Sequence, residues 1–151
     1  MPDSLLDFQL EQAIGMHVNR TAFLMTEEIG RRFTSNGYAL SAQDFSILFR
    51  LLKQGPMTQV EIAALTMRDK TTITRRIDGL AKKGLVERNT CQDDRRCFRI
   101  ALTEAGDQAL AAMIPLVRDF QQEVLSDIPD EEKEVTIKTL KYISDKLITL
   151  K

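Results

Sequence analysis

Apolar residues recur at intervals of three and four along most of the chain, and one short segment interrupts this pattern with a different period. Near the N-terminus, Leu6, Leu10 and Ile14 follow the helical spacing, which predicts one long helix over about residues 4–33. Further apolar residues widen the stripe, so this helix must be covered by more than one neighbour. Asn36-Gly37 predicts the turn that follows it.

Three shorter helices are predicted next, each from a capping residue in front of an apolar run. Ser41, Thr58 and Asp69 are suitable N-caps, and Thr58 with Glu61 has the spacing of a capping box. Gly84 is suited to end the third helix in a left-handed conformation. That third helix has a predicted buried stripe and an opposite polar face. The stripe contains Ile73, Ile77 and Leu80, and the polar face contains Thr71, Arg75, Asp78 and Lys82.

The interruption is strand-like. Residues 85–88 and 98–102 favour two short strands joined by a polar tip at 92–95, and such a hairpin must pack against the helices. Thr103 then caps a helix to about residue 125, in which Pro115 predicts a kink or a break. A last helix starts after Pro129. The order predicts a mainly α protein with a small β-wing: a winged helix-turn-helix with long N- and C-terminal helices.

The distribution of charge along the chain says more about function than the overall composition does. The chain has 151 residues and a net charge of −1, which alone argues against a general nucleic-acid binder. However, residues 68–99 contain ten Lys and Arg against five Asp and Glu. A basic module on an acidic scaffold is typical of nucleic-acid binding. No signal-peptide pattern and no apolar run long enough for a membrane span are found, so we expect a cytoplasmic protein.

Two stretches carry a family resemblance. They are DKTTITRRIDGLAKKGLVER and DDRRCFRIALTEAG, and the second contains the run Asp94-Arg95-Arg96, six further residues and then Thr103. With these stretches the chain resembles the MarR family of bacterial transcriptional regulators. The resemblance covers nearly the whole chain and is most specific from Thr58 to Gly106. It implies a single domain over 1–151, in which 1–34 and 104–151 are dimerisation helices and 41–103 is the DNA-binding lobe.

The resemblance also implies a function. It implies a homodimer that binds a palindromic operator in double-stranded DNA as a transcriptional repressor, released by a small phenolic or lipophilic effector and needing no cofactor. The implied major-groove residues are Thr71, Thr72, Thr74 and Arg75. The implied wing residues are Arg95 in the minor groove with Asp94 and Arg96 bracing it, and the implied phosphate contacts are Thr58, Gln59, Arg68 and Arg76.

The chemistry of these side chains agrees with those roles. Arg75 can bond guanine bidentately, threonine offers a hydroxyl and a methyl group, and an arginine suits a narrow minor groove. The alternatives are a solvated helix face for Thr71, Thr72 and Arg75, and an ordinary charged hairpin tip for Arg95 and Arg96, where a surface ion pair contributes little.

Three residues of the first long helix, Met16, His17 and Phe23, are candidates for an effector pocket. The alternative is that they pack in the core or in a dimer interface. His17 is the only histidine, and with two cysteines six residues apart it does not resemble a zinc site, so we expect no metal. No catalytic constellation is present, and an enzyme is not expected.

Cys91 and Cys97 bracket the wing tip. If they face each other across the hairpin, a disulfide there would make a redox switch, in which oxidation removes DNA binding and Cys→Ser at either position prevents the loss. The alternative is two small residues in a reducing cytosol, where stable disulfides are rare. A further alternative for the whole chain is a winged helix that binds a protein and no DNA, and an activator role is also compatible with the sequence.

Overall fold

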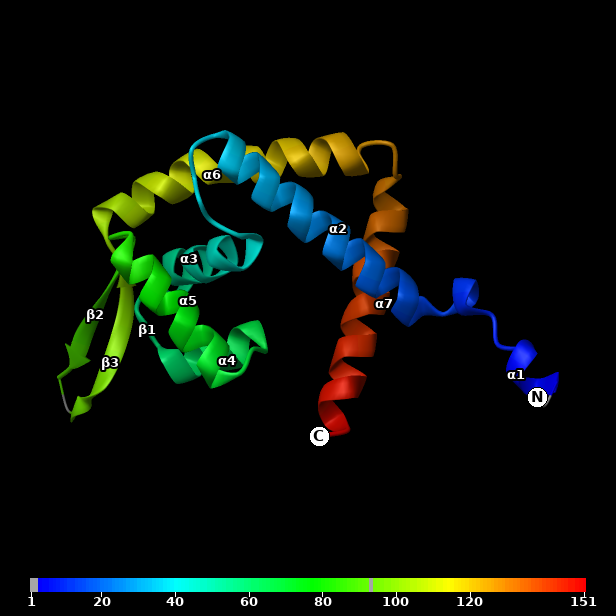
Figure 1. Ribbon diagram of the computed structural model, residues 1–151, viewed down its shortest axis with the longest axis horizontal. Coiled ribbons are helices and arrows are strands. Elements are labelled where there is room, and N and C mark those ends of the chain that lie inside the picture. The colour runs from blue at the N-terminus through cyan, green and yellow to red at the C-terminus, as the bar shows by residue number, and fades with distance from the viewer. Residues whose placement is uncertain (1–2, 93) are drawn as a thin grey trace. The chain divides into compact units, whose positions relative to one another are not determined.

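A computed structural model describes residues 3–92 and 94–151, and the side chains of all of these except Asp3, Ser4 and Arg95. The chain forms two compact units, residues 1–116 and 117–151. Figure 1 shows the elements in chain order. Helix α6 (Glu104–Leu125) passes from the first unit into the second and continues beyond Pro115. Of the two outcomes predicted at Pro115, a break is therefore wrong, since a proline removes only one hydrogen bond of a helix that long, and a kink remains a prediction.

The N-terminal segment differs from the prediction. Instead of one helix over residues 4–33, the structure has a short helix α1 (Asp3–Leu6), a 3-10 turn η1 (Leu10–Gln12) and a long helix α2 (Ile14–Ser35). Residues 5–12 are all exposed, so no packing within the chain supports a helix there. Because most helical stability in proteins comes from packing of an apolar face, the periodic pattern alone did not make one helix.

The three short helices begin at the predicted N-cap residues. Helix α3 (Ala42–Gln54) starts with a complete capping box between Ser41 and Asp44. Helix α4 (Gln59–Thr66) is capped by Thr58, which accepts a hydrogen bond from the Glu61 amide. Helix α5 (Lys70–Lys82) starts at Asp69, and Gly84 adopts a φ of 74° after its end, as the C′ position predicts.

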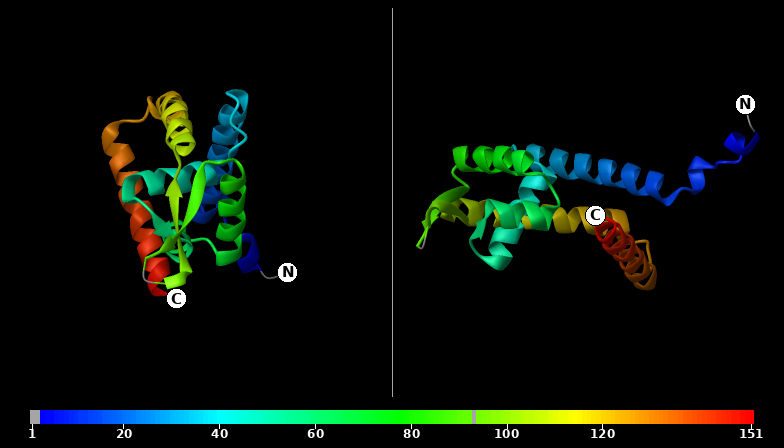
Figure 2. Two further views of the ribbon diagram at one scale, coloured as in Figure 1. Left: turned by 90° about the vertical axis from the view of Figure 1, so that its left-hand side faces the viewer. Right: turned by 90° about the horizontal axis from the view of Figure 1, so that it is seen from below.

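The wing is part of a three-stranded antiparallel sheet. Strands β2 (Val86–Cys91) and β3 (Asp94–Leu102) form the predicted hairpin, and both are longer than predicted. A third strand, β1 (Met57–Thr58), pairs with the other side of β3, with Met57 opposite Ile100. The sequence did not predict β1 because a strand of two residues is too short to show an alternation of apolar and polar positions. The hairpin projects from the helices of the first unit (Figure 2).

The hydrophobic core of the first unit holds α5 and the hairpin in place, because several helices and one strand contribute side chains to it. Helix α4 contributes Ile62, whereas Leu65 of the same helix is 37% exposed. The side chains that are at most 2% exposed come from α2, α3, α4, α5, β3 and α6, and they are Phe33, Ile47, Leu48, Ile62, Ile73, Ile77, Leu80, Ile100, Leu110 and Met113.

The second unit contains the end of α6 and the last helix, α7 (Asp130–Thr149), which begins after Pro129 as predicted. No residue of α7 is buried, although Val135, Ile137 and Tyr142 are all apolar and at least 60% exposed. Soluble helices normally cover such side chains, so this surface is suited to a partner. Within the described ranges 3–92 and 94–151, no helix is both long and apolar enough to cross a membrane.

Candidate nucleic-acid interface

The start of α5 is fixed by Asp69. One carboxylate oxygen of Asp69 accepts a hydrogen bond from the backbone N–H of Thr72 (2.7 Å), and the other accepts one from the Thr72 hydroxyl (3.0 Å). These two bonds, the backbone one first, hold the pKa of the Asp69 carboxyl below its ordinary value. The cap therefore stays charged near neutral pH, and the Thr72 hydroxyl is engaged within the protein.

The outer face of α5 is open. Ile73, Ile77 and Leu80 are at most 1% exposed, so one side of the helix is anchored in the core. Thr71 and Arg75 lie one turn apart on the other side, and both are exposed. Neither side chain forms a hydrogen bond or ion pair with any residue that the structure describes. Arg75 therefore presents a free guanidinium on a helix whose orientation the core determines.

Thr74 connects α5 to α4. Its hydroxyl accepts a hydrogen bond from Nε2 of Gln59 (3.1 Å) and donates one to the carbonyl oxygen of Lys70 (2.9 Å). Both hydrogen-bonding directions of this hydroxyl are thus used within the protein. Of the four predicted major-groove residues, the structure leaves the side chains of Thr71 and Arg75 free and engages those of Thr72 and Thr74.

The predicted phosphate-binding residues lie around this face. Arg68 is exposed just before α5. Arg76 extends toward the N-terminus of α3, where its Nη1 donates to Ser41 Oγ (3.1 Å) and lies 3.7 Å from a carboxylate oxygen of Asp44. Thr58 and Gln59 begin α4, and the structure uses both in hydrogen bonds within the lobe.

The wing carries a further link that the sequence did not reveal. Arg88 of β2 forms an ion pair with Asp78 of α5, which joins the wing strand to the helix. The signal available in the sequence was a pair of opposite charges on each side of the tight turn at Gly84. Arg96 is exposed, and its backbone N–H donates to Oδ1 of Asp94 (2.9 Å). The side chain predicted for the minor groove, that of Arg95, lies outside the described part of the chain.

The two cysteines are bonded to each other. A disulfide joins Cys91 of β2 to Cys97 of β3, with a Cα–Cα distance of 5.4 Å. The sequence alternative of two unconnected small residues therefore does not describe this structure. The closed loop between the two cysteines contains both wing arginines.

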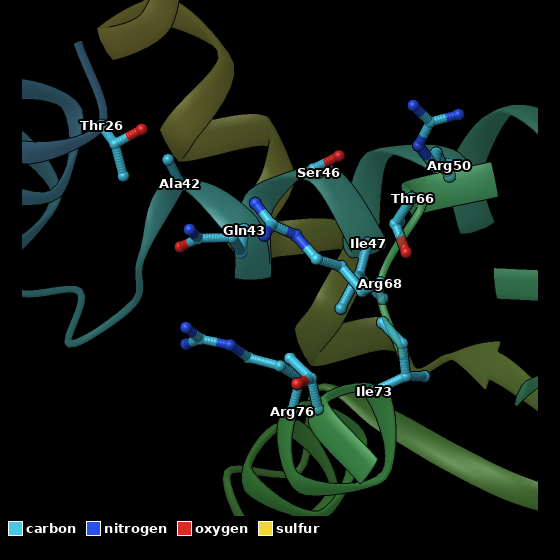
Figure 3. Close-up of a pocket in the computed structure, with 11 residues that line it drawn as sticks. Thr26, Ala42, Gln43, Ser46, Ile47, Arg50, Thr66, Arg68, Ile73 and Arg76 are labelled. Carbon is cyan, nitrogen blue, oxygen red and sulfur yellow. The ribbon is translucent and has the colours of Figure 1, made fainter. Parts of the chain in front are cut away.

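A pocket of about 310 Å³ lies behind α5 (Figure 3). Arg50 of α3, Arg68 before α5 and Arg76 of α5 supply three cationic side chains to its lining. Nε of Arg50 is buried and has no hydrogen-bond partner among the described residues. The remaining lining residues include no carboxylate and are Thr26, Ala42, Gln43, Ser46, Ile47, Thr66, Thr72 and Ile73.

The predicted effector residues lie elsewhere on α2. Met16 is half-buried, whereas His17 and Phe23 are exposed, and Nε2 of His17 lies 2.5 Å from the carbonyl oxygen of Glu11. None of the three lines the arginine pocket. Sequence reasoning missed that pocket because its arginines come from separate segments and share no motif.

Comparison with known proteins agrees with this geometry. The model of the MarR family matches residues 40–98. AbsC, a MarR family transcriptional regulator from Streptomyces coelicolor, has a TM-score of 0.77 and 26% identity, with 89% of this chain and 90% of that chain covered.

Two structures of lower identity share the fold. Bordetella bronchiseptica BpsR, whose DNA binding is regulated by 6-hydroxynicotinic acid, has a TM-score of 0.82 and 21% identity over 91% of this chain and 97% of that chain. MepR from S. aureus, in a complex with DNA, has a TM-score of 0.80 and 20% identity over 92% and 99%. The segment that matches the MarR family model contains α3, α4, α5 and most of the wing, and the chain has the winged helix-turn-helix fold of these MarR-type structures.

Proposed function

We propose that this protein is a sequence-specific DNA-binding transcriptional repressor of the cytoplasm, which binds a palindromic operator as a homodimer and releases it when a small organic anion binds. The observation that carries this proposal is the free guanidinium of Arg75 on the open face of α5. A helix that is anchored in the core on one side and polar on the other fits the major groove. The fold of MepR in its DNA complex supports the same use of this lobe.

Charge supports DNA as the partner. The excess of five basic residues over residues 68–99 coincides with α5 and the wing, and contacts of such residues with phosphates provide salt-dependent affinity. Thr58, Gln59, Arg68 and Arg76 remain the predicted phosphate contacts. Arg95, with Arg96 and Asp94, remains the predicted minor-groove contact.

The exposed apolar side chains support a homodimer. On α2, Ile14, Phe23 and Leu24 are 52–61% exposed, and α7 has the exposed stripe already described. A second copy of the chain supplies matching apolar surfaces, since the same helices occur in both subunits. Two recognition helices one DNA turn apart, about 34 Å, would then bind the two halves of a palindrome.

The arginine pocket supports an anionic effector. The lining has three arginines and no carboxylate of its own, although Arg76 also lies 3.7 Å from Asp44 outside it. Such a lining favours a carboxylate ligand, which binds guanidinium groups through charge-assisted bonds and would give the buried Nε of Arg50 a partner. The volume suits a small aromatic acid. Thr72 and Arg76 connect the pocket to α5, so a bound anion that pulls Arg76 from Ser41 changes the position of the recognition helix. Met16, His17 and Phe23 remain the alternative effector site.

Selection from a pool of random duplex DNA, repeated over a series of salt concentrations, tests DNA binding. We expect enrichment of a palindrome and an affinity that falls steeply as salt rises. The Arg75→Ala variant should lose that enrichment. Weak binding with no enriched sequence would instead favour a winged helix that binds a protein partner.

Calorimetric titration tests the effector class. We expect 6-hydroxynicotinic acid and benzoate to bind the wild-type protein and to release the selected operator. The Arg50→Gln variant should bind neither acid while keeping its operator affinity. Equal binding by wild type and Arg50→Gln would contradict this pocket, and loss of binding after His17→Ala would favour the alternative site.

A further inference from the structure

The hairpin changes register at the cysteines. From Val86 opposite Leu102 to Thr90 opposite Phe98, the two strands pair without interruption. Continuing that register would place Cys91 opposite Cys97. In the structure, Cys91 pairs with Asp94 instead, so β3 advances four residues where β2 advances one. The three additional residues, 95–97, form a bulge beside the ladder.

Cys91 holds both ends of this bulge. Its backbone pairs with Asp94 at one end, and its Sγ is bonded to Cys97 at the other. The backbone N–H of Arg96 also donates to the Asp94 carboxylate inside the loop. Arg95 and Arg96 therefore belong to a closed ring beside the strand, and Gln92 lies in the turn of the hairpin.

The dithiol form has another arrangement available. Without the bond, Cys91 can pair opposite Cys97 in the register of the rest of the hairpin, and the turn then moves to the residues around Asp94. The centre of that register is Asp94, so the backbone of Arg95 then lies within the turn and no longer in a closed ring. The two forms differ in where the chain places its wing arginines.

The pair is open to small oxidants and reductants. Both cysteines are only half-buried, and they lie on a hairpin that projects from the helices (Figure 2). The sequence contains no other cysteine, so each is the other's resolving partner. In a cytoplasm poised by glutathione, an accessible pair of this kind is held as the dithiol until an oxidant arrives.

We propose that Cys91 and Cys97 form a redox modification site that reacts with hydroperoxides, and that the disulfide form of the wing binds the operator less tightly than the dithiol form. The inference rests on the proposed DNA-binding function. One thiol attacks the peroxide, which gives a sulfenic acid and an alcohol. The other thiol then displaces the hydroxyl as water and closes the S–S bond.

The reaction balances with one hydroperoxide for each cysteine pair. Two electrons and two protons leave the thiols, and the hydroperoxide becomes one alcohol and one water. Two molecules of a monothiol restore the pair by thiol–disulfide exchange and become one disulfide. The site is thus reversible without any metal or cofactor.

The test compares three proteins: wild type, Cys91→Ser/Cys97→Ser and Cys97→Ser. Each is reduced with dithiothreitol, desalted without oxygen, and treated with cumene hydroperoxide or buffer. Alkylation followed by mass spectrometry counts the free thiols, and titration of the operator selected with reduced protein measures affinity. A second dithiothreitol treatment separates disulfide formation from oxidation of the six methionines, which that reagent does not reverse.

We expect wild type to lose both alkylatable thiols, to bind the operator about tenfold more weakly, as for one lost arginine contact, and to recover fully after reduction. The double serine variant should bind equally before and after peroxide. Equal affinity of the two wild-type forms, failure of the thiols to pair within one chain, or an equal loss in the double variant would overturn the inference. Failure of every reduced protein to select DNA would instead overturn the proposed function, and this inference with it.

Discussion

The side-chain amide of Gln59, in the first turn of α4, donates a hydrogen bond over 3.1 Å to the hydroxyl of Thr74 in the middle of α5. The two residues are fifteen positions apart and are both half-buried. This bond directly links the two helices of the helix-turn-helix through their side chains. The relative orientation of α4 and α5 therefore depends on a polar contact as well as on the core.

A double-mutant cycle with Gln59→Ala and Thr74→Val tests that link. We expect each substitution to lower the free energy of unfolding by about 1 kcal/mol, with a coupling of similar size, because each removes the same hydrogen bond. Urea unfolding at one fixed protein concentration measures all four proteins. Additive effects would mean that the bond does not stabilise the lobe.

Arg75→Ala tests the recognition helix without disturbing its packing. Because the side chain is exposed and free, we expect unchanged thermal stability but an operator affinity about 10–100-fold lower, the equivalent of about 1–3 kcal/mol for a lost bidentate base contact. Preference at one base position should also relax. Lys138→Ala, which removes an exposed positive charge from α7, is the control. A similar loss in both variants would indicate a general charge effect rather than base recognition.

Local chemistry made much of this fold predictable. Ser41 and Asp69 cap their helices through side-chain bonds that span three residues, and Gly84 supplies the positive φ that ends α5. Such features need only neighbouring residues. The prediction of one helix over about residues 4–33 was wrong for the opposite reason. The periodic apolar residues at 5–12 are exposed, and no packing within the chain selects a helix there.

The candidate site was predictable where one element carries it and not where several do. Thr71 and Arg75 follow from the helical period of α5. The arginine pocket brings Arg50, Arg68 and Arg76 together from three segments, and the Arg88–Asp78 pair depends on how the wing leaves α5. These arrangements are consequences of tertiary packing, which spacing along the sequence does not specify.

The cap of α5 gives a pH-dependent prediction. Because the folded-state pKa of Asp69 is below its ordinary value of 3.8, the carboxylate contributes stability above pH 3.8 that is lost as pH falls through the folded-state pKa. Asp69→Asn keeps a capping side chain but does not titrate. We therefore expect the melting temperature of wild type to fall relative to that of Asp69→Asn over this acidic range. A constant difference from neutral to acidic pH would show that the cap does not titrate on unfolding.

Two glycines give the last prediction, because alanine meets very different surroundings at each. At Gly106, in the first turn of α6, a Cβ would lie 2.2 Å from the backbone oxygen of Leu85, whereas at Gly79 in α5 no heavy atom lies within 4 Å.

The close approach at Gly106 follows from how α6 begins. The N–H of Thr103 donates to the carbonyl oxygen of Leu85 (3.1 Å), and the Thr103 hydroxyl donates to that of Gly84 (2.5 Å), so the helix start is held against this backbone. We expect Gly106→Ala to lower the free energy of unfolding by about 1–3 kcal/mol, because the backbone must move. Gly79→Ala should raise it by about 0.5–1 kcal/mol, since alanine favours a helix interior. Thermal unfolding of both variants measures the two changes. An equal rise in stability at the two positions would mean that both substitutions act only through helix propensity, and it would contradict the contact with Leu85.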